Sequence, residues 1–144
     1  MNTVIEHIPS GSPKHMNKNW VIKEKIKENQ SLLAQDWSSF TDFYKRGCVY
    51  VIKDKENTIL GFAIVNDKDY LSVIAVLPSE QNKGLGSELI GNIKSEFDFF
   101  YLHVRQSNEP AIRFYKKMGL EKTGSVEEYY DNCDTAYVMS YYAY

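Results

Sequence analysis

The segment of this 144-residue chain best suited to chemistry is a short glycine-rich turn. Gln81, Gly84 and Gly86 form the pattern Gln-x-x-Gly-x-Gly, between an apolar run that ends at Pro78 and an amphipathic run that begins at once. The first backbone N–H groups of a helix have no partner within the helix, so such a helix start is suited to bind a phosphate or pyrophosphate. The pattern therefore predicts a strand, a phosphate-binding turn and a helix, although a glycine-rich turn that binds nothing would have the same sequence.

The spacing around this turn excludes two common nucleotide-binding motifs. A P-loop needs Lys followed by Ser or Thr after its last glycine, whereas Gly86 is followed by Ser87 and Glu88. A dinucleotide-binding fingerprint needs a third glycine at the position where this chain has Leu89. If the turn binds a phosphate, the phosphate belongs to another kind of molecule.

Hydrophobic periodicity and turn residues predict the elements that would position this turn. Pro110 fits the first turn of the last predicted helix, which Ser107 or Asn108 would cap. Antiparallel hairpins flank one crossover helix, so we expect a mixed α/β sheet. Strands are expected at residues 3–8, 48–53, 58–65, 70–77, 99–105, 120–126 and 135–142, and helices at 17–35, 36–45, 85–97 and 108–118.

The composition predicts a single ordinary globular domain over residues 1–144. The chain is 43% hydrophobic and 25% charged with a net charge of -2, which argues against nucleic acid as the main partner. Cys48 and Cys133 lack metal-type spacing, so no metal is expected; free thiols are the simpler interpretation and a disulfide is the alternative. The apolar runs are too short for a bilayer and the N-terminus is unlike a signal peptide, so we expect a cytoplasmic protein without a membrane partner.

Three separated motifs resemble the GNAT N-acetyltransferases over almost the whole chain, and in particular the RimI and NatE-type subgroup that acetylates protein N-termini. They are QNKGLG at 81–86, VRQSNEPAIRFYKKMGLEKTG at 104–124, where Leu120 replaces the usual Phe, and EYYDNCDTAYVM at 128–139. The resemblance implies the GNAT α/β fold, a mixed and mostly antiparallel sheet of about six to seven strands flanked by about four helices. It also implies direct transfer of an acetyl group from acetyl-CoA to an amine, foremost the N-terminal α-amine of a protein or peptide.

Two other functions remain open at this point. The acceptor could be a lysine side chain, a polyamine or another small amine, or the chain could be a non-catalytic GNAT module that binds CoA or a partner protein. Many members of the subgroup work with an auxiliary subunit beside their first helices, and such a partner is possible here. The sequence is compatible with a monomer or a homodimer.

The resemblance assigns acetyl-CoA to three parts of the chain. Backbone groups of one strand would pair with the pantetheine arm, with an N–H near Val76 facing the thioester oxygen. Asn108 would reach the same arm, and the glycine-rich turn would hold the pyrophosphate. The implied residues are Ile74, Ala75, Val76 and Leu77 on the strand, and Gln81, Asn82, Lys83, Gly84, Leu85, Gly86 and Ser87 in the turn.

The resemblance also implies three catalytic residues. Tyr115 lies at the position of the family's general acid, and Tyr70 and His103 match the NatE-type pair that handles the proton of the amine. An α-amine has a pKa of about 7.7–8.0 and is already partly neutral at physiological pH, whereas a lysine side chain has a pKa of about 10.4. A histidine with a pKa near 6.5 is therefore a better matched base for an α-amine acceptor than for a lysine acceptor. His103 alternates with Tyr101 and Arg105 on the less apolar face of its strand, which argues against a buried core histidine.

Three aromatic residues are implied on the acceptor side. Tyr129 and Tyr130 match the tyrosines that hold the first backbone groups of the substrate in this subgroup. Phe40 falls where the subgroup has an aromatic residue lining the first side-chain pocket, and an ordinary buried helix anchor is the alternative for it.

Overall fold

The computed structural model describes residues 2–26, 36–130 and 133–144. Its elements follow the predicted order, with one short 3-10 helix in addition; the end of the predicted first helix, residues 27–35, lies outside the described residues. The elements are β1 (Thr3–Ile8), α1 (Met16–Ile26), α2 (Trp37–Arg46), β2 (Cys48–Asp54), β3 (Ile59–Val65), β4 (Leu71–Val76), η3 (Pro78–Glu80), α3 (Leu85–Glu96), β5 (Phe99–Arg105), α4 (Glu109–Lys117), β6 (Glu121–Val126) and β7 (Ala136–Tyr142).

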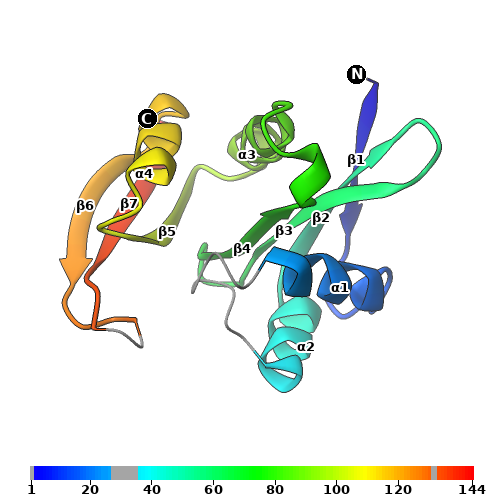
Figure 1. The fold of residues 1–144 in the computed structure, drawn as a ribbon, viewed down its shortest axis with the longest axis horizontal. Coiled ribbons are helices and arrows are strands. Elements are labelled where there is room, and N and C mark those ends of the chain that lie inside the picture. The colour runs from blue at the N-terminus through cyan, green and yellow to red at the C-terminus, as the bar shows by residue number, and fades with distance from the viewer. Residues whose placement is uncertain (1, 27–35, 131–132) are drawn as a thin grey trace.

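The strands form two sheets where the sequence predicted one. A four-stranded sheet has the order β1-β2-β3-β4 and a three-stranded sheet has the order β5-β7-β6, with antiparallel pairing throughout. The sheets meet at an isolated parallel bridge between Tyr70 and Tyr101, where the Tyr101 N–H donates to Asp69 O at 3.0 Å. Beyond this bridge β4 and β5 separate, and Figure 1 shows the two sheets on opposite sides of the molecule. Residue alternation predicts which face of a strand is buried but not how far two neighbouring strands stay paired, which is why the split was missed.

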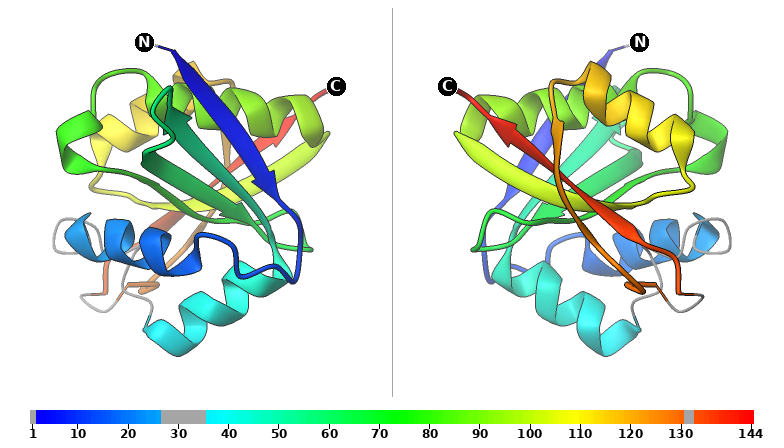
Figure 2. Two further views of the ribbon diagram at one scale, coloured as in Figure 1. Left: turned by 90° about the vertical axis from the view of Figure 1, so that its right-hand side faces the viewer. Right: turned by 90° about the vertical axis from the view of Figure 1, so that its left-hand side faces the viewer.

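Helices cover both faces of the four-stranded sheet. Figure 2 shows α3 and α4 on one side of the strands, and α1 and α2 on the other. All seven residues of β3 are buried because this strand lies in the middle, between two apolar clusters. One cluster contains Leu89 and Ile93 of α3, and the other contains Phe40 and Tyr44 of α2. Within the described part of the chain, no helix is long and apolar enough to cross a bilayer.

Candidate active site

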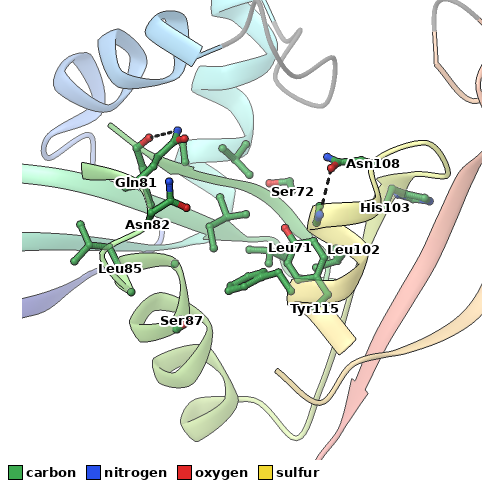
Figure 3. A pocket seen from close by; sticks show the side chains of 18 of the residues that line it. Leu71, Ser72, Gln81, Asn82, Leu85, Ser87, Leu102, His103, Asn108 and Tyr115 are labelled. Atoms are coloured by element: carbon green, nitrogen blue, oxygen red, sulfur yellow. Dashed lines mark hydrogen bonds between the residues drawn. The ribbon is translucent and has the colours of Figure 1, made fainter. Parts of the chain in front are cut away.

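A pocket of about 490 Å³ lies where β4 and β5 separate. The starts of α3 and α4 complete its walls, and Figure 3 shows Gln81 and Leu85 at one end and His103 at the other. The structure therefore brings most of the predicted cofactor and catalytic residues to one cavity. Those that line it are Tyr70, Ile74, Ala75, Val76, Gln81, Asn82, Gly84, Leu85, Gly86, Ser87, His103, Asn108 and Tyr115.

The edge of β4 presents to this pocket backbone groups that do not pair with β3. The N–H of Leu77 donates to Leu60 O at 2.9 Å, whereas the carbonyl of Val76 accepts from the side-chain Nε2 of Gln81 at 3.2 Å. Backbone groups of successive strand residues point to opposite edges, so those of Val76 and Ile74 point away from β3 and toward β5. This edge is suited to pair with an extended ligand.

Two residues of the predicted cofactor set are not at the pocket. Leu77 does not line it, and both of its backbone groups are used inside the protein, because its carbonyl also accepts from Glu80 N at 2.8 Å. Lys83 is also absent from the lining, and its ammonium pairs with Glu80 at 2.7 Å. Neither residue therefore lines the pocket in this structure, and their contact with the ligand stays a prediction.

The start of α3 offers unpaired donors. Gly84 precedes the helix in the left-handed conformation, with φ of 83°, and no side chain caps the helix. The first hydrogen bond within the helix runs from Glu88 N to Gly84 O at 3.1 Å. The N–H groups of Leu85, Gly86 and Ser87 therefore have no partner within the helix. Since this end of a helix also carries partial positive charge, it is suited to bind an anion.

Asn108 caps a helix and also lines the pocket. Its side-chain Oδ1 accepts from Ala111 N at 3.2 Å and so caps α4, which confirms one of the two predicted caps. The cap uses one lone pair of this oxygen and leaves both hydrogens of Nδ2 to serve a ligand.

His103 and Tyr70 form a hydrogen-bonded pair. His103 Nδ1 lies 2.8 Å from Tyr70 Oη, and the tautomer of the histidine decides which of the two donates. Burial and neighbouring tyrosines raise the pKa of the Tyr70 phenol, and burial lowers the pKa of His103. Both side chains are therefore neutral near neutral pH.

Local structure fixes both members of this pair. Asn66 Oδ1 accepts from Lys68 N at 2.8 Å and from Tyr70 N at 3.1 Å, which builds the turn that delivers Tyr70. On β5, alternate residues are buried and His103 falls on the partly exposed face, as its alternation with Tyr101 predicts.

Tyr115 lies deep in the same cavity. It is 7% exposed, it lies on α4, and burial raises the pKa of its phenol to about 12. The neutral phenol is therefore the dominant form at any physiological pH, and it is available as a proton donor.

Two of the residues predicted to bind the amine acceptor, Tyr129 and Tyr130, lie close to His103 or to each other. The ring of Tyr129 stacks on His103 with centroids 4.5 Å apart, and Tyr130 lies against Tyr129 at 5.0 Å. Neither tyrosine lines the pocket, so both lie outside the predicted cofactor site. The hydroxyl of Tyr130 is buried and has no hydrogen-bond partner among the described residues.

Phe40, which is predicted to line a side-chain pocket of the acceptor, lies in the core in this structure. It has no exposed surface and packs against Trp20 at 5.2 Å and Phe62 at 6.0 Å between ring centroids. The periodicity of α2 places Phe40 on the inward face, but here that face meets core rather than a cavity, so the buried-anchor alternative fits.

Some lining residues were missed from the sequence. Ser72 lies two residues before Ile74 on β4, so the period of a strand indicates that they share a face. Phe114 precedes Tyr115 on α4 and carried no signal beyond an ordinary helix aromatic. Among the described residues, no group of three or more His, Cys, Asp or Glu could hold a metal ion.

Comparison with known proteins gives a family and a fold. Residues 15–120 match the family described as the acetyltransferase (GNAT) family. The Escherichia coli ribosomal-protein-S18-alanine N-acetyltransferase has a similar structure, with a TM-score of 0.81 at 22% identity over 97% of this chain and 93% of that chain. This likeness confirms the predicted α/β architecture.

Two curated relatives are similar in sequence over part of their length. An N-alpha-acetyltransferase of Sulfurisphaera tokodaii is 34% identical over 79 residues, which are 51% of this chain and 47% of the relative. The peptidyl-lysine N-acetyltransferase YiaC of Escherichia coli is 26% identical over 88 residues, which are 53% of this chain and 60% of the relative. This chain thus spans about half the length of these relatives, whose names describe two different acceptors.

Proposed function

The chain belongs to the acetyltransferase (GNAT) family, and from this premise we propose that it transfers the acetyl group of acetyl-CoA to the N-terminal α-amine of a protein or peptide. The observation that carries the proposal is the hydrogen bond of 2.8 Å between His103 and Tyr70 at one end of the pocket. The N-alpha-acetyltransferase relative supports the same acceptor.

The pocket has the donor groups that acetyl-CoA needs, and acetyl-CoA supplies an activated acetyl thioester. The open edge of β4 at Ile74 and Val76 would pair with the amides of the pantetheine arm. The N–H groups of Leu85, Gly86 and Ser87 would hold the pyrophosphate. The carboxylate of Glu80 also lines the pocket, and its ion pair with Lys83 offsets its repulsion of phosphate.

His103 would accept the proton of the amine. When the ring hydrogen is on Nδ1, His103 donates to Tyr70 Oη and leaves the lone pair of Nε2 free. Burial lowers the pKa of His103, so it is a weak base. An α-ammonium group with a pKa of about 7.7–8.0 loses its proton to such a base far more readily than a lysine with a pKa of about 10.4.

Tyr115 would donate the proton that the departing thiolate of CoA requires. It lines the same pocket as His103 but lies on α4, a different element, so the acid and the base approach the reaction from different walls. The two groups thus divide the work, one taking a proton from the amine and the other giving one to sulfur.

Lysine acetylation is the second candidate, and the observation that favours it is the peptidyl-lysine relative, YiaC. A non-catalytic module that binds CoA is the third. The test is to measure thiol release from acetyl-CoA with short peptides that have a free α-amine and no lysine, and with matched peptides that have a blocked α-amine and a free lysine. Turnover of the first set alone supports the proposal, turnover of the second set alone favours lysine, and acetyl-CoA binding without any turnover favours the non-catalytic module.

The Gly86→Ala variant is expected to weaken acetyl-CoA binding by about tenfold while leaving the fold intact. A methyl group at this position would meet Phe114 Cζ at 3.5 Å, which is ordinary contact, so the free protein tolerates it. Gly86 lines the pocket, however, and the methyl group would take space that the pyrophosphate needs. Calorimetric titration with acetyl-CoA measures the effect.

The matched control for this variant is Gly91→Ala on the same helix. A methyl group there meets nothing within 4 Å, and alanine favours a helix by roughly 0.5–1 kcal/mol. We expect Gly91→Ala to bind acetyl-CoA like the wild type and to melt slightly higher. Equal affinity of the two variants would place the pyrophosphate elsewhere.

A further inference from the structure

A charged pair next to His103 fastens the loop between β6 and β7 to strand β5. Arg105 Nη1 lies 2.7 Å from Asp134 Oδ2, and the two side chains are 18% and 37% exposed. Ser107 Oγ approaches the same oxygen at 3.4 Å. Arg105 follows His103 by two residues on β5, so both side chains lie on the same face of the strand.

The same aspartate holds Tyr129, which stacks on His103, and its neighbour Tyr130. The backbone carbonyl of Asp134 accepts from Tyr129 N at 3.0 Å and from Tyr130 N at 3.3 Å. The guanidinium of Arg105 lies 4.2 Å from the centre of the Tyr130 ring, and the Tyr129 ring stacks on His103. A closed series of contacts therefore runs from Arg105 through Asp134 and Tyr129 to His103, which is on the same strand as Arg105.

Two of the described residues in this loop have an unfavourable backbone conformation. Glu128 has φ of 53° and Cys133 has φ of 66°, and residues with a side chain rarely adopt this left-handed region. Such conformations persist when surrounding contacts hold them in place. A partly buried hydrogen bond between two charged groups is among the stronger contacts available for this purpose.

We propose that Arg105 and Asp134 are positioning residues that hold Tyr129 against His103 and Tyr130 against Tyr129, and thereby set the binding of the amine acceptor. This inference rests on the proposed function, since it assigns the two tyrosines to the acceptor side. Neither Arg105 nor Asp134 lines the acetyl-CoA pocket, so the pair acts on the acceptor and not on the cofactor.

The test compares the variants Asp134→Asn and Arg105→Lys with the wild type. Asp134→Asn removes the charge and keeps the backbone carbonyl, whereas Arg105→Lys keeps the charge and loses the planar group over Tyr130. For each variant, KM for the acceptor peptide is expected to rise about tenfold, and KM for acetyl-CoA to stay within about twofold. The double variant should be no worse than about the more severe single variant, because both changes act on the same connected set of contacts around Asp134 and Tyr130.

The control removes an exposed ion pair that does not contact Tyr129, Tyr130 or His103. Glu109 and Arg113 on α4 are 80% and 70% exposed and 3.9 Å apart, so Glu109→Gln should leave both KM values unchanged. Unchanged acceptor KM in Asp134→Asn and Arg105→Lys would overturn the proposal. An equal rise of both KM values would also overturn it, because the pair would then support the fold in general.

A second readout does not depend on turnover. Hydrogen exchange of the Tyr129 and Tyr130 amides should be at least about tenfold faster in Asp134→Asn than in Glu109→Gln, because those amides donate to the residue that the ion pair holds. If the wild type acetylates no amine, the proposed function fails, and faster exchange still supports the positioning role. Unchanged exchange overturns that role whatever the activity.

Discussion

Replacement of His103 with alanine is expected to lower the rate of acetyl transfer at saturating substrates by about a hundredfold or more, the usual contribution of a general base. The Tyr70→Phe variant removes the partner of His103 Nδ1 and is expected to lose about tenfold, since the ring keeps its base but not its orientation. Thiol release from acetyl-CoA with a peptide that has a free N-terminus measures both rates.

The pH dependence distinguishes a base from a residue that only packs. Neutral His103 is the active form, and it is lost as pH falls through its pKa, which burial lowers from 6.5. The rate at saturating acceptor should therefore rise with pH along a limb below 6.5, and this limb should be absent from His103→Ala.

Tyr101→Phe is the matched control for the His103 experiment. It removes the hydroxyl of Tyr101, whose ring centroid lies 4.9 Å from that of Tyr70, and leaves the His103–Tyr70 hydrogen bond in place. We expect a rate within about twofold of the wild type. A wild-type rate in His103→Ala would mean that another group, or water alone, takes the proton.

Replacement of Tyr115 with phenylalanine is the second large effect, and it should lower kcat by about a hundredfold while acetyl-CoA still binds within about twofold of the wild-type affinity. The substitution removes only the hydroxyl of a residue that is 7% exposed, so packing on α4 is kept. The phenol donates its proton only while it is neutral, below its pKa of about 12. Its ionisation should therefore cause no loss of rate between pH 7 and pH 10 in the wild type.

Tyr141→Phe controls for the loss of a tyrosine hydroxyl from the same core. Tyr141 packs against Phe100 at 5.4 Å in the cluster that contains Tyr115, but it lies on β7 and does not line the pocket. Calorimetry for binding and single-turnover kinetics for chemistry separate the two variants. If Tyr115→Phe lost binding and rate together, the phenol would be a binding group rather than the acid.

Local sequence patterns predicted the elements and one wall of the site. The strands Thr3–Ile8 and Phe99–Arg105 have their predicted bounds, because alternating apolar residues between turn signals define a strand locally. The turn from Gln81 to Ser87 was also found, because the unpaired donors of a helix start are a property of the local backbone.

What the sequence could not predict depends on pairing at a distance. Arg105 and Asp134 are 29 positions apart, and nothing in a chain with 17 Lys and Arg and 19 Asp and Glu marks these two as partners. For Phe40, helical periodicity predicts an inward side chain, but only the packing of Trp20 and Phe62 around it decides that the inside is filled. The separation of β4 from β5 is of the same kind, since it depends on the twist of two sheets.

The open edge of β4 has a consequence for the protein before any ligand arrives. An unpaired strand edge invites another chain to add a strand, which is a common route to aggregation. Here the edge at Ile74 and Val76 lies within a pocket that residues at the starts of α3 and α4 also line. To pair with this edge, a strand of another chain would have to enter the same cavity, between the residues of α3, α4 and β5 that line it. The walls that shape the cofactor site therefore also protect the chain from pairing with its neighbours.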